Sequence, residues 1–125
     1  MEIERYPVGE QRKMYFAEGE ALGHSHRWLG GQYCSITTSV GIVGCGIYDV
    51  GVADEFGMAF ALAKGSPGCP LVQPEDLLEA RIVKISKKAR EMGIVEGMTG
   101  RSAVESMLVY AKRSESRFDG LLGEM

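Results

Sequence analysis

This sequence of 125 residues lacks several of the features that usually reveal a function. Its three cysteines are odd in number and show no Cys-x-x-Cys spacing, which argues against a disulfide framework and a four-cysteine zinc site. No apolar run approaches the ~20 residues needed to cross a bilayer, and no signal peptide precedes the first strand pattern. We therefore expect a cytoplasmic protein with reduced thiols and no membrane partner.

The chain also lacks an excess of basic charge. Its formal net charge is -3, so it has no positive field to gather phosphates, and we expect no nucleic-acid partner. Hydrophobic residues make up 45% and charged residues 25%, the balance of one globular domain spanning residues 1–125. Glycine is in excess: its 17 copies are about twice the usual ~7%, which indicates many turns and close backbone contacts.

The first third of the chain has the alternation and aromatic content of strands. Residues 2–7 alternate and end at a proline, which favours a short edge strand, and residues 13–22 predict a second strand. Residues 23–31 are bounded by glycines and hold both histidines and the only tryptophan, so we expect a loop there. Residues 32–38 are β-branched and aromatic and predict the next strand.

The apolar stretch at 41–51 predicts a central strand that pairs with residues 32–38. We favour a three-residue hairpin loop, with Gly41 in the left-handed conformation because valine is a poor residue for positive φ. That register places Cys34 opposite Gly46 and Cys45 opposite Ser35, so the two cysteines lie on opposite faces. A slip of one residue reverses this arrangement.

The second half of the chain begins with a short helix or turn at 49–57, for which Asp49 is the candidate N-cap. A buried strand is expected at 58–63 and a loop at 64–70. A helix begins at Pro74, and the pattern over 75–92 fits either one helix or a helix, a strand and a second helix capped by Ser86. We favour the broken version.

A last helix is expected after Thr99, which is its candidate N-cap. Its apolar positions run to Ala111, and we expect it to fray after Lys112 into a charged tail at 113–125.

Two short motifs in this order resemble a known prokaryotic family. The first is Cys45-Gly46 followed by Asp49, and the second is Gly93 followed by Gly97-Met98-x-Gly100-Arg101. Over residues 31–111 the chain is similar to the domain-of-unknown-function 1805 family, the YunC-like proteins, with residues 2–22 as additional N-terminal strands. The resemblance implies no established activity and no cofactor.

The resemblance implies an α+β domain with a mainly antiparallel sheet of about five strands, flanked by two or three helices. The chain departs from the family at the start of the last helix, where members tend to carry Ser-Gly-Arg-Glu and this chain has Thr99-Gly-Arg-Ser102. Thr99 can still cap the helix, but Ser102 is too short to reach back as a glutamate would.

Cys45 is the sharpest candidate for chemistry. Its neighbours Gly44 and Gly46 leave the backbone open to a ligand or another chain. Asp49 would lie roughly 13 Å away on a straight strand, too far for a direct dyad. The alternative, which we favour, is a packed and inert thiol, because free cysteines are among the most buried residues.

Two further sites are weaker candidates. His24 and His26 would face the same way in an extended segment, as a transition-metal site requires, but only Cys69, Asp49 or Asp54 offer a third ligand. Gly100 and Arg101 present the helix start and the cation that an anion-binding site could use, but we favour the alternative, a capped turn whose glycines satisfy the backbone conformation. We expect no metal site.

Two functional interpretations follow. The first is a non-catalytic module that forms a homo-oligomer and binds a protein or small-molecule partner, favoured because no strong catalytic constellation is present. The alternative is a small enzyme or metal-binding protein that uses Cys45 with the histidine segment or the Arg101 turn.

Overall fold

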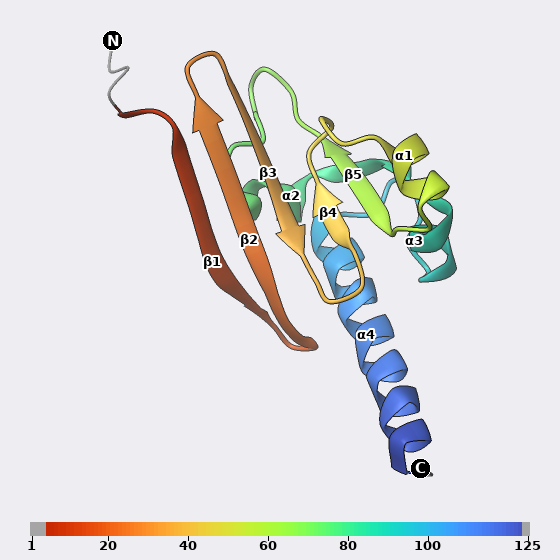
Figure 1. The fold of residues 1–125 in the computed structure, drawn as a ribbon. Helices are drawn as coiled ribbons and strands as arrows, with labels where there is room; N and C mark the ends of the chain where they lie inside the picture. Colours follow the sequence, from red (N-terminus) through yellow and green to blue (C-terminus); the bar gives the residue numbers. More distant parts are fainter. Residues whose placement is uncertain (1–4, 124–125) are drawn as a thin grey trace.

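The structure is a computed structural model that describes the backbone of residues 5–123 and the side chains of residues 5–114. Six strands and four helices follow one another along the chain (Figure 1). They are β1 (Val8–Phe16), β2 (Gly19–Trp28), β3 (Gly31–Thr37), β4 (Ile42–Gly44), α1 (Val50–Glu55), β5 (Phe60–Lys64), α2 (Pro74–Glu79), β6 (Arg81–Ile85), α3 (Lys87–Glu91) and α4 (Gly100–Gly123).

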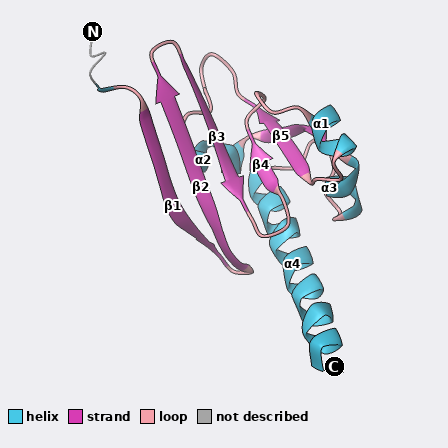
Figure 2. Cartoon of the chain, viewed as in Figure 1, coloured by secondary structure: helices cyan, strands magenta, loops and turns pink. Residues whose placement is uncertain are grey.

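All six strands form one sheet whose spatial order is the chain order, β1-β2-β3-β4-β5-β6. Every neighbouring pair is antiparallel except β4 and β5, which are parallel and are joined through α1. The expected α+β class with a mainly antiparallel sheet is therefore confirmed, with six strands instead of about five and four helices instead of two or three (Figure 2). Within residues 5–123, no helix is long and apolar enough to cross a membrane.

Helices α2 and α4 pack on one face of the sheet, which we call the covered face. Its side chains are small or aliphatic, and the core forms between them and the apolar positions of α4. The opposite face carries no helix over β1, β2 and β3, and we call this the open face (Figure 1). Because side chains alternate along a strand, the register assigns each strand residue to one face or the other.

The strand expected at 32–38 is confirmed as β3, but the other expected elements of the first third were wrong in position. Within residues 5–7 there is no strand, while residues 1–4 lie outside the described part of the chain. The single strand expected at 13–22 is instead the end of β1, a two-residue turn and the start of β2, which begins at Gly19 with φ 148. The expected loop at 23–31 is mostly strand β2, because Gly23 makes room for packing and does not turn the chain: a Cβ there would meet Pro74 Cγ at 2.7 Å.

The hairpin between β3 and β4 has a register one residue away from the expected one. Ser35 pairs with Gly44, which brings Cys34 opposite Cys45, and the N–H of Cys45 donates to the Cys34 carbonyl at 3.2 Å. The loop is shorter than expected because the Thr38 hydroxyl accepts from the N–H of Gly41 at 3.0 Å, and Gly41 has no positive φ. Gly41 is required for space, since a Cβ would lie 2.7 Å from the Ala59 carbonyl oxygen.

The broken pattern over 75–92 is confirmed as α2, β6 and α3. Ser86 ends the strand and caps α3: its hydroxyl accepts from Ala89 N and also donates to Met58 O at 2.7 Å. After α3 the chain turns at Gly93, whose φ of 90 disfavours a side chain. Strand β6 separates helices α2 and α3, and its side chains Ile82 and Ile85 are both buried in the core, which favours the strand over a continuous helix.

The last helix, α4, begins after Thr99 as expected. Thr99 Oγ1 accepts from Ser102 N at 3.1 Å and donates to the Ser102 hydroxyl, so the short side chain of Ser102 bonds the capping hydroxyl instead of the backbone. The expectation that the helix frays after Lys112 was wrong, because it continues to Gly123. Residues 124–125 lie outside the described part.

Candidate functional site: a pair of thiols under the second helix

Cys45 follows the last residue of β4, in the middle of the sheet. Its side chain is on the covered face with only 8% of the residue exposed. After Cys45 the chain turns, and the N–H of Tyr48 donates to the Cys45 carbonyl at 3.5 Å. The straight-strand distance to Asp49 therefore does not apply. Asp49 instead caps α1, accepting from Gly51 N at 2.7 Å.

Cys34 lies across from Cys45 on the neighbouring strand, and the two thiols share a hydrogen bond. Neither cysteine is part of a disulfide in this structure. The Cys34 thiol donates to Cys45, and the Ile47 backbone N–H also donates to it, which together lower the pKa of Cys45 well below that of an ordinary cysteine despite its burial. The same hydrogen bond and burial raise the pKa of Cys34. Of the two thiols, Cys45 is therefore the one that loses its proton more readily.

The glycines on either side of Cys45 have different surroundings. At Gly44 an added Cβ would meet the Tyr48 ring at 2.6 Å, so this glycine is covered by an aromatic side chain on the open face. Gly46 is exposed, and a Cβ there would meet only the Ala63 carbonyl at 3.8 Å. The backbone after Cys45 is therefore accessible, and the backbone before it is not.

His24 and His26 lie on β2 and face the same way, but on the open face. Their neighbours Ser25 and Cys34 pair across the strands on the covered face, so the sheet separates the imidazoles from the thiols. Partial burial, and then the charge of His26, lower the pKa of His24. His26 stacks on Tyr33 with ring centroids 4.6 Å apart.

The expected third ligands do not join the histidines. Asp54 accepts from Lys87 N at 2.6 Å at the start of α3, and Cys69 is exposed in the loop after β5. Among the described side chains, no group of three histidines, cysteines or acids is placed to hold a metal ion.

Gly100 and Arg101 lie at the start of α4, away from Cys45. A Cβ at Gly100 would lie 1.8 Å from the Leu77 carbonyl oxygen, so the glycine allows α2 and α4 to touch. The N–H of Gly100 already donates to Ala80 O at 2.9 Å, and the guanidinium of Arg101 is 3.7 Å from a Glu79 carboxylate oxygen. A wide hollow of about 750 Å³ lies between the 64–72 loop and α2, but neither Cys45 nor Arg101 lines it.

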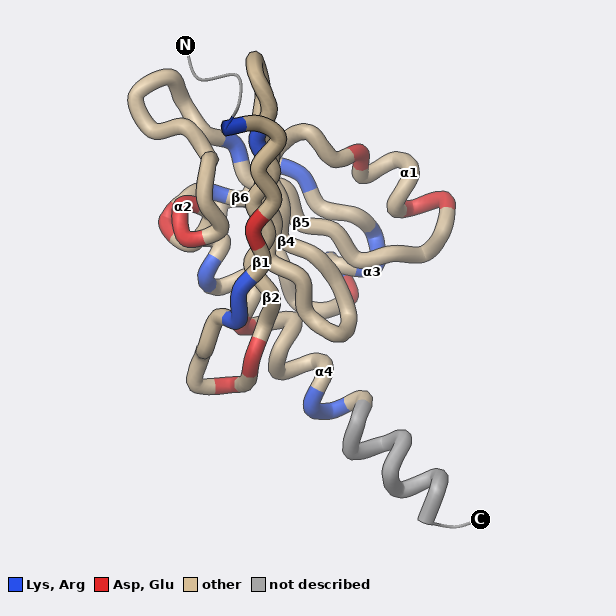
Figure 3. Tube along the Cα trace, turned by 60° about the vertical axis from the view of Figure 1, so that its left-hand side comes forward, with Lys and Arg blue, Asp and Glu red and all other residues tan. Residues whose placement is uncertain are grey.

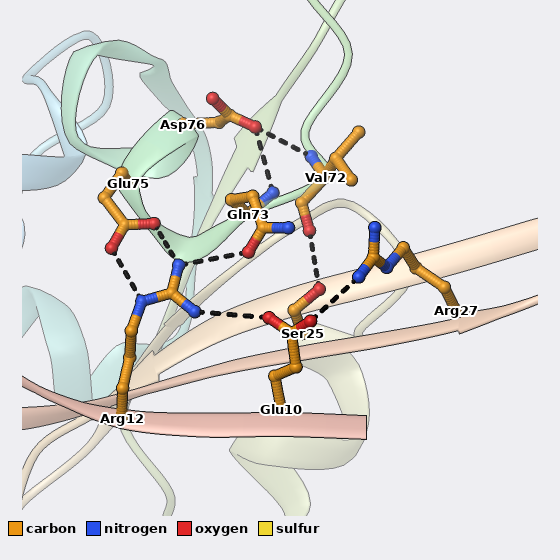
Figure 4. A network of polar contacts seen from close by, with 8 residues as sticks. All are labelled: Glu10, Arg12, Ser25, Arg27, Val72, Gln73, Glu75 and Asp76. Carbon is orange, nitrogen blue, oxygen red and sulfur yellow. Dashed lines mark hydrogen bonds and ion pairs between the residues drawn. The ribbon is translucent and has the colours of Figure 1, made fainter. Parts of the chain in front are cut away.

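A polar network that no sequence pattern predicted holds the start of α2 against the covered face (Figure 4). Arg12 of β1 forms a two-pronged ion pair with Glu75 and donates to the Gln73 side chain at 3.0 Å. The Ser25 hydroxyl, which is buried beside Cys34, donates to Val72 O at 3.0 Å. Figure 3 shows the acidic residues of α2 close to the basic residues of the sheet edge.

A row of rings across the open face was also missed. It runs from Trp28 through Tyr33 and Tyr48 to Phe60, with successive centroids 6.1, 6.2 and 5.5 Å apart. The signal in the sequence was the alternation of His24, His26 and Trp28, which fits one face of a strand but was assigned to a loop.

Comparison with known proteins gives a match over the segment that contains Cys45, Gly100 and Arg101. The model of a family described as Domain of unknown function (DUF1805) matches residues 44–107, about half of the chain, and includes both motifs. The chain belongs to this family. A comparison of the chain with curated proteins found no match.

One solved structure supports the fold of this DUF1805 protein. It is the crystal structure of a protein of unknown function, TA1206, from Thermoplasma acidophilum. The match has a TM-score of 0.71 at 17% identity and covers 80% of this chain and 93% of the other. At that identity the likeness shows the fold alone.

Proposed function

We propose that this chain is a non-catalytic module that forms a homo-oligomer through the open face of its sheet. The observation that carries the proposal is the row of rings across β2, β3, β4 and β5. An antiparallel sheet face that remains in water is normally polar. Here the face holds the row of rings, whose end member Trp28 is 42% exposed, and also Tyr15 of β1, which lies outside the row and is 71% exposed.

A second copy of the chain fits this face better than a charged partner does. Beside the rings the face carries Lys13 and Glu20, whose charged groups are 3.8 Å apart, so it offers both signs of charge to its own image. A two-fold interface brings the same patch of both copies together and requires such self-complementarity. Exposed tyrosine and tryptophan are the residues that most often anchor interfaces.

Light scattering at micromolar concentration tests the proposal. We expect a dimer or larger oligomer for the natural chain and a monomer for the double variant Tyr15→Glu with Trp28→Glu. Val95→Glu, at an exposed apolar residue outside the open face, is the matched control and should leave the oligomer intact. A natural chain that is monomeric, or equal effects of the two variants, would contradict self-association through this face.

The alternative, an enzyme or metal-binding protein centred on Cys45, has less support. The imidazoles lie across the sheet from the thiol, and Arg101 pairs with Glu79. The lowered pKa of Cys45 supports this alternative. It requires that the Cys45 thiol is labelled rapidly in the folded protein and that His24→Gln suppresses this labelling.

A further inference from the structure

The two thiols on the covered face are positioned for a bond that neither motif nor family assigns. Cys34 and Cys45 occupy opposite positions of an antiparallel ladder, and the Cys45 N–H donates to the Cys34 carbonyl. Opposite residues in such a hydrogen-bonded pair have Cα atoms about 5.5 Å apart. Disulfides span Cα separations of about 4.4 to 6.8 Å, so the backbone here already fits one.

The two thiols differ in access. Cys34 is fully buried at 0% exposure, and Cys45 retains 8%. The exposed Gly46 follows Cys45 directly, so the part of the chain next to this thiol lies at the surface. With 8% of Cys45 exposed, we expect a molecule close to water in size, such as hydrogen peroxide, to reach its sulfur more readily than a protein or a bulky thiol reagent does.

They also differ in reactivity. Cys45 accepts hydrogen bonds from the Cys34 thiol and from the Ile47 N–H, which stabilise its thiolate. The hydrogen bond to Cys45, then burial, then the negative charges of Cys45, Asp76 and Glu75 raise the pKa of Cys34, which therefore keeps its proton. The thiolate is the form that attacks an oxidant.

We propose that Cys34 and Cys45 are a redox modification site that hydrogen peroxide converts to an intramolecular disulfide, with Cys45 attacking the oxidant and Cys34 resolving the product. The proposal is independent of self-association through the open face. It assigns a role to the first family motif, which contains Cys45.

The reaction balances in two steps. The Cys45 thiolate attacks one peroxide oxygen, the O–O bond breaks, and the departing hydroxide takes a proton to become water, which leaves a sulfenic acid on Cys45. The Cys34 sulfur then attacks the Cys45 sulfur, an S–S bond forms, and the hydroxyl group leaves as water with the proton of the Cys34 thiol. The two sulfurs lose two electrons in total, and one peroxide becomes two waters.

Peroxide titration of the Cys69→Ser protein tests the pairing, because that variant removes the exposed third thiol and prevents disulfides between chains. We expect the intact mass to fall by two hydrogen atoms, both thiols to disappear together, and peptide mapping to join Cys34 to Cys45. Dithiothreitol should restore both thiols. If the folded Cys69→Ser protein keeps both thiols through the titration, or takes up oxygen without forming this bond, the proposal is wrong.

Two single variants on the Cys69→Ser background test the order of the steps. With Cys34→Ser we expect dimedone to trap a sulfenic acid on Cys45. In the Cys45→Ser variant we expect Cys34 to react with peroxide about tenfold more slowly than Cys45 does in the Cys34→Ser variant, since a protonated thiol is a poor nucleophile. Preferential trapping on Cys34 would overturn the assigned roles. If either variant fails to fold, peptide mapping after stoichiometric peroxide still decides whether the two cysteines pair.

Discussion

The two faces of the sheet are built from different kinds of side chains. The covered face holds small residues such as Gly23, Ser25 and Cys34, and the start of α2 approaches it closely enough for the Ser25 hydroxyl to bond Val72 O. The open face holds rings that stack on one another, with Tyr33 in contact with both His26 and Tyr48.

This difference separates two kinds of chemistry within one thin sheet. The covered face encloses the two thiols, of which only Cys45 is partly exposed, at 8%. The open face carries the aromatic rings, and Trp28 at the end of their row is 42% exposed. A change on one face should therefore leave the property of the other face intact.

The largest expected effect is on stability, and it comes from adding one methyl group to the covered face. The same change on the open face is the control. Gly23→Ala places a Cβ 2.7 Å from both Met14 Sδ and Pro74 Cγ, and we expect the free energy of unfolding to fall by about 2 kcal/mol through overpacking. Gly9→Ala on the open face meets its nearest atom, His26 Nδ1, at an ordinary 3.4 Å and should cost little. Urea denaturation measures both, and equal losses would break the comparison.

A smaller effect is expected from the ion pair that attaches α2 to the covered side. Arg12→Met removes its hydrogen bonds to Glu75 and Gln73 and should lower the free energy of unfolding by about 1 kcal/mol, the upper range for a surface pair. Lys13→Met, which removes the looser pair with Glu20 on the open face, is the control and should change stability by much less.

The pH dependence of that loss sharpens this prediction. The hydrogen bond from Arg12 holds the pKa of Glu75 below its usual value. The stabilisation is therefore present above the unfolded pKa of about 4.3 and is lost as the pH falls through the lower folded value. The difference between the natural chain and Arg12→Met should shrink below about pH 4. A difference that stays constant in acid would show that Arg12 acts through packing alone.

The smallest expected effect lies on the open face, at His24. Partial burial and the neighbouring His26 lower the pKa of His24, so the unfolded chain takes up a proton at a higher pH than the folded one. Stability should therefore decline as the pH falls below about 6.5, and it should decline less for His24→Gln. Proton NMR titration gives the pKa directly, and a value at or above that of a free histidine would contradict the argument.

The sequence predicted the second half of the fold well because local signals mark its boundaries. Pro74 opens α2, Ser86 caps α3, and Thr99 caps α4, and each does so through groups within a few residues. The first half failed where the deciding contact is remote. Gly23 belongs to a strand because Pro74, far along the chain, packs against it, and no local rule carries that information.

The candidate site was predicted only in part, because local sequence signals identify Cys45 but do not determine which residue lies opposite it. Cys45 was identified correctly as a buried thiol near a central strand, but its partner was missed by one step of register. That step depends on the Thr38 hydroxyl, which accepts from Val40 N at 3.3 Å and from Gly41 N and so tightens the loop. A side chain that bonds its own turn can reverse the faces of a whole strand.

The order of the strands in the sheet has a consequence for how the chain acquires its structure. Each strand pairs with the one before it in the sequence, so every new strand meets a partner that has already left the ribosome. Short sequence separations between partners also lower the entropy cost of each pairing. We therefore expect the hairpin of β1 and β2 to assemble first during synthesis and α4 to dock last, completing the core against β4, β5 and β6.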